Sequence, residues 1–184
     1  MKKLFLLSCL AGGLAVSPAF AAETATMVAP ATERVGVYDS RAVAYAQFWS
    51  EEGMRNKNEL VVAAKAARAA GDTERARALS QQLSQLQSRL HLQVFSTEPV
   101  DNILAQISDQ LPALLRQAGV ARLVCKWDTA ALAQLGTAEQ IDVTDQLVQL
   151  FRPGEKQLKV LAELKRKPPL PLDQARELEK QGKM

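Results

Sequence analysis

Apolar side chains recur at helical spacing from about residue 41 to 95, a stretch that Gly71 divides into two arms. On the second arm, leucines follow one another at intervals of four, three and four residues, the pattern of a coiled-coil seam. The first arm presents a stripe of mostly alanines, and alanine opposite leucine lets two helices approach closely. We therefore expect an antiparallel helical hairpin with its tip at Gly71-Asp72-Thr73. The facing positions are Leu79, Leu83, Leu86 and Leu90 against Leu60, Ala63, Ala64 and Ala67.

The first arm contains about 30 residues, so an unbroken helix would be roughly 45 Å long at about 1.5 Å per residue. Gly53 lies among polar neighbours and is the expected position of a bend or a break. After the hairpin, apolar residues again follow helical spacing, and Pro112 should kink or divide this helix before it ends at Gly119.

Short β-prone segments interrupt the helices at residues 34–38, 120–127 and 140–143. One face of the second segment carries Ala121, Leu123, Cys125 and Trp127, and the other carries Arg122, Val124 and Lys126. This alternation predicts a half-buried strand. Together with the helices, these strands predict an α+β, mostly helical fold. It would consist of a small, few-stranded β-body from which the helical hairpin protrudes.

The N-terminus has the form of a secretory signal peptide over residues 1–21. Lys2 and Lys3 precede an apolar run, and cleavage is expected after Ala21. The run is too short for a transmembrane helix, which needs about 20 residues. Lipidation at Cys9 is a minor alternative. We expect export to the periplasm, followed by a flexible leader over residues 22–33.

The remaining chain divides into a domain over residues 34–152 and a helical tail over residues 153–184. Within the tail, a basic triplet at 165–167 precedes a proline-rich linker at 168–171, expected to be extended. This stretch has the form of a docking peptide, but a linker that carries or pins the terminal helix is the simpler interpretation.

Charge and composition exclude several functions. Loss of Lys2 and Lys3 lowers the net charge from +3 to +1, which gives no argument for nucleic-acid binding. Cys125 would be the lone cysteine after cleavage and is expected to be a buried structural thiol. His91 is the single histidine, so no multi-histidine metal cluster is possible. No metal or other cofactor is expected.

One stretch raises the question of catalysis: Asp39, Ser40 and Arg41 follow the first strand. A carboxylate there could act as a base or nucleophile, but the sequence contains no catalytic motif that would supply partners. A helix cap formed by Asp39 or Ser40 is the favoured interpretation. We expect a protein that is not an enzyme, with no catalytic residues.

A few residues further on, Tyr45, Phe48 and Trp49 lie at helical spacing. They could form an exposed cluster that binds other proteins, or they could pack into the core.

Two stretches resemble the Skp/OmpH-like family of periplasmic chaperones. Residues 34–43, RVGVYDSRAV, look like the opening strand and helix of that family. Residues 117–125, QAGVARLVC, and 141–148, IDVTDQLV, resemble its closing strands and last helix, with Thr144 as the expected cap. The likeness covers about residues 34–151, although the hairpin matches only in pattern.

The resemblance implies a trimer whose hairpins surround a cavity for unfolded outer-membrane proteins. The near-neutral charge, the short arm and the added tail depart from the family pattern. The expected function is that of a homo-oligomeric periplasmic holdase, with no nucleic-acid partner. The alternative is an envelope interaction or scaffold module on the same fold.

Overall fold

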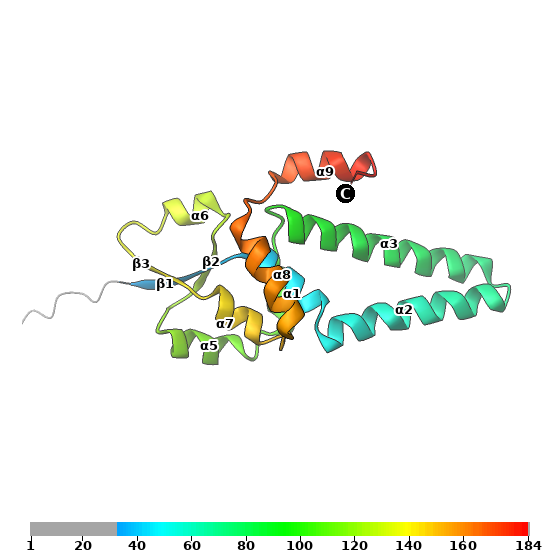
Figure 1. Cartoon of the computed structure of the whole chain (residues 1–184), viewed down its shortest axis with the longest axis horizontal. Helices are drawn as coiled ribbons and strands as arrows, with labels where there is room; N and C mark the ends of the chain where they lie inside the picture. The colour runs from blue at the N-terminus through cyan, green and yellow to red at the C-terminus, as the bar shows by residue number, and fades with distance from the viewer. Residues whose placement is uncertain (1–32, 184) are drawn as a thin grey trace, which may run out of the picture. The chain divides into compact units, whose positions relative to one another are not determined.

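The computed structural model describes residues 33–183, which are mostly helical with one small sheet, as the sequence predicts (Figure 1). The predicted signal peptide and nearly all of the leader lie outside the described residues. The elements are β1 (Arg34–Tyr38), α1 (Ser40–Phe48), α2 (Glu51–Ala69), α3 (Thr73–Phe95), α4 (Asp101–Gln106), α5 (Leu111–Ala118), β2 (Leu123–Cys125), α6 (Thr129–Ala133), β3 (Glu139–Asp142), α7 (Thr144–Gln149), α8 (Glu155–Arg166) and α9 (Leu172–Lys180).

The sheet has three parallel strands in the order β2-β1-β3. Gly36 on the central strand is in register with Leu123 on one side and Ile141 on the other. Because the strands are parallel, their carboxyl ends lie at one edge of the sheet, and α1 and α7 begin there. Two strand-to-helix junctions are thereby brought close together.

Both faces of the sheet are covered, which corrects the expectation of a half-buried second strand. Leu123 and Cys125 pack against the main core beneath α4, α5 and α7. Val124, expected on the less buried side, is only 6% exposed because it packs with Val35 and Leu135 beside α6. Parallel strands of this kind are normally covered on both faces.

The expected long first arm consists of two helices, α1 and α2, because the helix is interrupted at Trp49 and Ser50. The Ser50 hydroxyl donates to the backbone carbonyl of Gln47 at 2.6 Å and accepts from the Gly53 N–H at 3.0 Å, which caps α2. The hairpin therefore begins at Glu51 instead of about residue 41. Its first arm has 19 residues, so it is shorter than predicted, at roughly 28 Å.

The bend or break expected at Gly53 lies a few residues earlier, and Gly53 itself packs closely against the end of α1. A Cβ at this position would lie 2.3 Å from the Gln47 carbonyl oxygen and 2.7 Å from that of Phe48. Only glycine therefore lets α2 begin so close to the end of α1.

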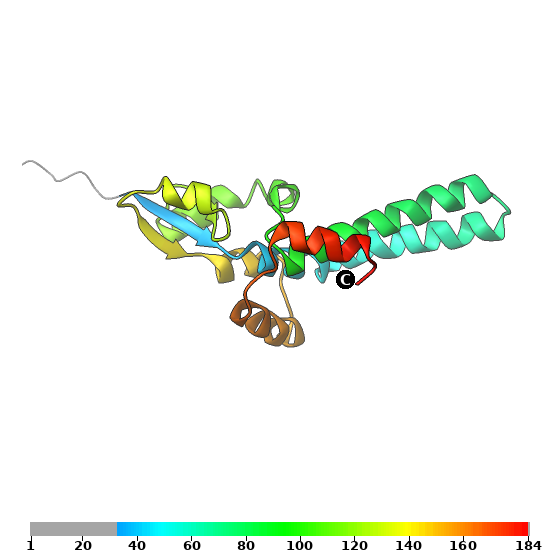
Figure 2. The ribbon, with the colours of Figure 1, turned by 90° about the horizontal axis from the view of Figure 1, so that it is seen from above.

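The two hairpin arms, α2 and α3, pack side by side in both views (Figures 1 and 2). Ala64, Ala67 and Ala76 are buried between them, whereas the leucines of the seam are half-buried. At the tip, Gly71 has a φ of +74° and the Asp72 carboxylate accepts from the Arg75 N–H at 3.0 Å. The predicted hairpin and its tip are confirmed.

The predicted division at Pro112 is also observed, since α4 and α5 are separate helices and Pro112 lies in the first turn of α5. Gly119 ends α5 with a φ of +64°.

The C-terminal segment packs on the other elements. Leu161 of α8 is 3% exposed and contacts Ala42 and Ala46 of α1 and Val148 of α7. In the linker, the Leu170 N–H donates to the Phe95 carbonyl at 2.9 Å. Beyond it, α9 lies along α3 with Ala175 buried. Among residues 33–183, no helix is both long and apolar enough to cross a membrane.

Candidate functional site

Asp39 lies at the junction between β1 and α1 and is completely buried. Its Oδ1 accepts a hydrogen bond from the Arg41 backbone N–H at 3.1 Å, so it is the N-cap of α1. The predicted capping role is confirmed for Asp39. Ser40 is the first helical residue, and its buried hydroxyl has no hydrogen-bond partner within the described part of the chain.

Three side-chain hydrogen bonds and an ion pair with Lys126 make the site more than a cap. The Arg41 guanidinium donates from Nε to Oδ1 at 3.1 Å and from Nη2 to Oδ2 at 2.9 Å, and the residue is buried. The Lys126 ammonium lies 2.9 Å from Oδ2, and the Trp127 indole N–H donates to Oδ1 at 3.0 Å. The indole ring packs against both cations, with Arg41 Cζ 4.9 Å and Lys126 Nζ 4.8 Å from its centroid.

A second junction joins this cluster. The Thr144 Oγ1 accepts from the Asp39 backbone N–H at 3.0 Å, while the Asp142 carboxylate accepts from the Thr144 N–H at 2.8 Å. The expectation that Thr144 caps α7 is therefore wrong. Its hydroxyl instead accepts a hydrogen bond from Asp39 at the end of the neighbouring strand, and this bond connects the start of α7 to the start of α1.

The electrostatics keep Asp39 ionised. Burial by itself raises the pKa of this carboxyl, but hydrogen bonds from Arg41, Lys126 and Trp127 and the charge of Lys126 outweigh burial, so the pKa lies below its ordinary value. Both carboxylate oxygens are occupied and no surface is exposed. A base or nucleophile must reach its substrate, so this geometry makes Asp39 a structural residue.

The other residues singled out in the sequence do not converge on a catalytic centre. Cys125 is a free, half-buried thiol packed against the main core. Lys165 forms an ion pair with Asp145 at 2.6 Å, and Arg166 with Glu163 at 2.7 Å. Across residues 33–183, no three His, Cys, Asp or Glu side chains are grouped as metal ligands.

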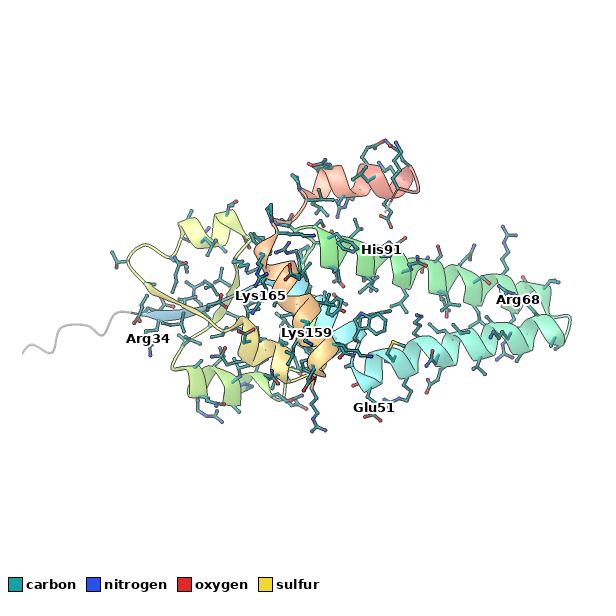
Figure 3. All side chains as sticks on the ribbon, in the orientation of Figure 1. Arg34, Glu51, Arg68, His91, Lys159 and Lys165 are labelled. Atoms are coloured by element: carbon teal, nitrogen blue, oxygen red, sulfur yellow. The ribbon has the colours of Figure 1, made fainter. Side chains whose placement is uncertain are left out.

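An apolar cavity of about 550 Å³ lies between the end of α1 and the facing sides of α2 and α3. We call it the hairpin-base groove. Figure 3 places His91, one of its lining residues, near the base of α3, far along the hairpin from Arg68 at the tip. The lining residues are Tyr45, Phe48, Trp49, Lys57, Val61, Leu83, Leu86, Gln87, Leu90, His91, Val94 and Phe95.

The aromatic residues of α1 form one wall of this groove. The Phe48 and Trp49 rings meet edge to face with centroids 5.2 Å apart, and Tyr45 lies 6.3 Å from Trp49. Tyr45 and Phe48 are half-buried, whereas Trp49 is 43% exposed. Core packing is confirmed for Tyr45 alone, which packs against two core clusters, whereas Phe48 lines the groove and Trp49 faces solvent. From α3, Phe95 is 48% exposed and adds a second aromatic surface that the sequence analysis missed.

The groove exists because the small residues of the hairpin are unevenly placed. Ala64 and Ala67 lie towards the tip and let the helices approach closely there. Nearer the base, α2 presents Lys57 and Val61 and the α1 aromatics intervene, so three of the four seam leucines line a cavity instead of closing a seam.

Comparisons of this chain with protein-family models, with curated proteins and with solved structures gave no match.

Proposed function

We propose that this protein is an exported, non-enzymatic holdase of the periplasm that binds unfolded envelope proteins. The Skp/OmpH-like resemblance of its sequence suggests this role, and the hairpin-base groove is the observation that supports it best. The groove is mostly apolar, is lined by aromatic rings, and includes the exposed Trp49 and Phe95.

The chemistry of the groove suits capture without covalent change. Aromatic and leucine side chains offer apolar area that an unfolded segment can cover, which removes that area from water. Because such contacts are not directional, they accept many sequences, as a holdase requires. No adenine-nucleotide site is needed for a cycle of binding and release of this kind.

The proposal includes self-association. Both outer strands, β2 and β3, have an unpaired edge within residues 33–183, and exposed edges are usually paired or covered. Light scattering gives the mass in solution. A trimer supports a client cavity shared by several hairpins, and a monomer contradicts it.

The test of holdase activity is dilution of a urea-unfolded outer-membrane β-barrel protein into buffer, with aggregation followed by turbidity. We expect the protein to suppress aggregation and the Trp49→Ser/Phe95→Ser variant to lose most of this effect. A matched control is Leu158→Ser/Val160→Ser, which removes similarly exposed apolar residues of α8, 39% and 45% exposed, outside the groove.

Two results would contradict the proposal. If the wild-type protein does not suppress aggregation, the holdase function is rejected in favour of the scaffold alternative. If both double variants lose suppression equally, the groove is not the binding site.

A further inference from the structure

The hairpin-base groove carries ionic charge of one sign only. Its basic side chains are Lys57 on α2 and His91 on α3, and no Asp or Glu lines it. Tyr45, its other titratable lining residue, has a pKa raised by burial and so stays neutral. A negatively charged occupant therefore meets attraction from the lining and no repulsion.

Lys57 is the lining residue best placed to meet such a charge. Its ammonium lies 5.4 Å from the centroid of the Phe48 ring, on the aromatic wall of the groove. Within residues 33–183 it forms no ion pair. Lys57 is a half-buried residue next to an apolar cavity, and its ammonium can bind an anion whose other end is apolar.

The lining also restricts which part of a protein chain can enter. Its hydrogen-bonding side chains are few, and most lining residues are purely apolar: Phe48, Val61, Leu83, Leu86, Leu90, Val94 and Phe95. A segment that crossed the groove would leave several peptide groups unpaired, which is unfavourable. A chain end brings fewer peptide groups and supplies a carboxylate.

We infer that the hairpin-base groove binds the carboxyl-terminal end of a client protein. One or two apolar C-terminal side chains enter the cavity, and the terminal carboxylate pairs with the Lys57 ammonium. The cavity of about 550 Å³ is of the size that proteins use for compact ligands. This inference rests on the proposed function and specifies which part of a client is recognised.

The test compares two fluorescein-labelled peptides of sequence Ser-Gly-Ser-Gly-Val-Leu-Phe, one with a free carboxylate and one with a C-terminal amide. Binding to the whole protein is measured by fluorescence anisotropy. We expect the carboxylate form to bind roughly tenfold more tightly. In Lys57→Gln this preference disappears while the affinity for the amide is unchanged, and in Lys57→Arg it is retained. Lys65→Gln, on the same helix but outside the groove lining, is the matched control and keeps the preference.

The possible failures are distinguishable. Equal affinity for the two peptides overturns the inference and leaves the holdase proposal standing, because apolar capture alone then explains binding. Binding of neither peptide overturns the inference alone if aggregation is still suppressed, and overturns both proposals if it is not. If the protein binds laurate but neither peptide, the inference is overturned in favour of a lipid as the occupant. If Trp49→Ser changes the oligomeric mass, the inference is overturned in favour of a second copy of this chain.

Discussion

Replacing Asp39 by alanine tests how much the buried charge cluster contributes to folding. The substitution removes the N-cap of α1, which is typically worth about 1 kcal/mol. It also leaves the Arg41 guanidinium, whose side chain is 2% exposed, without its carboxylate. Removing one partner of a buried ion pair usually costs about 3–5 kcal/mol. Since the same carboxylate serves both roles, we expect a total loss of about 3–5 kcal/mol, a large part of the stability of an ordinary domain.

The assay is urea unfolding followed by tryptophan fluorescence in a Trp49→Phe background, which leaves Trp127 of the cluster as the reporter. Asp72→Ala is the matched control, because Asp72 caps α3 in the same manner but is exposed and makes no ion pair in the part of the chain that the structure describes. We expect it to lose only about 1 kcal/mol.

A double variant separates the cap from the charge. Asp39→Ala/Arg41→Met removes the unpaired cation along with the carboxylate, so it should recover most of the loss beyond the cap. If Asp39→Ala costs no more than Asp72→Ala, or if the double variant is less stable than Asp39→Ala alone, the argument from buried charge is wrong.

Three further changes test other parts of the structure. Acid should destabilise the protein, because the pKa of Asp39 is lower in the folded state than its ordinary 3.8. The stabilisation is complete above that unfolded-state value and is lost as pH falls towards the folded-state pKa. Urea unfolding between pH 7 and 3 should therefore show that the free energy of unfolding falls less steeply with decreasing pH in Asp39→Asn than in the wild-type protein. The same pH dependence in both proteins would exclude Asp39 as a cause of the acid destabilisation. Gly53→Ala should cost about 1–3 kcal/mol, because its Cβ would overlap carbonyl oxygens of α1. Gly71→Ala, with open space but a positive φ, should cost about 1 kcal/mol, and a thermal melt ranks the two. Leu161→Ala should cost about 2–3 kcal/mol, whereas the more exposed Leu158→Ala should stay near zero; equal melting temperatures would show that α8 adds no core.

Local signals identified most of the elements. The first strand, the hairpin tip at Gly71, the division at Pro112 and the end of α5 at Gly119 were all correctly predicted. Each depends on periodicity or on one residue with a special backbone preference. The break after α1 was placed a few residues too late, at Gly53. The prediction relied on the weak helix propensity of glycine and overlooked Ser50, a good N-cap residue followed by acidic residues.

The candidate site was less predictable. Asp39 as a cap follows from its position between a strand and a helix, which is local information. The ion pair of Asp39 with Lys126 and the hydrogen bond from its backbone N–H to Thr144 join residues far apart in the chain. Nothing in the spacing of these residues specifies a contact, because the contact depends on which strands pair and in which direction.

The sequence by itself determined the order and type of the elements, because helix and strand periods, caps and turns are properties of neighbouring residues. The tertiary structure decided the rest. Parallel pairing of β1 with β2 and β3 placed the carboxyl ends of the strands at one edge, and the carboxylate, the two cations and the hydroxyl met there in a buried cluster. In the hairpin, the alanines lie towards the tip and bulkier residues towards the base. A cavity forms where side chains cannot fill the space between two helices, so the groove depends on how the helices pack and is not evident from the sequence.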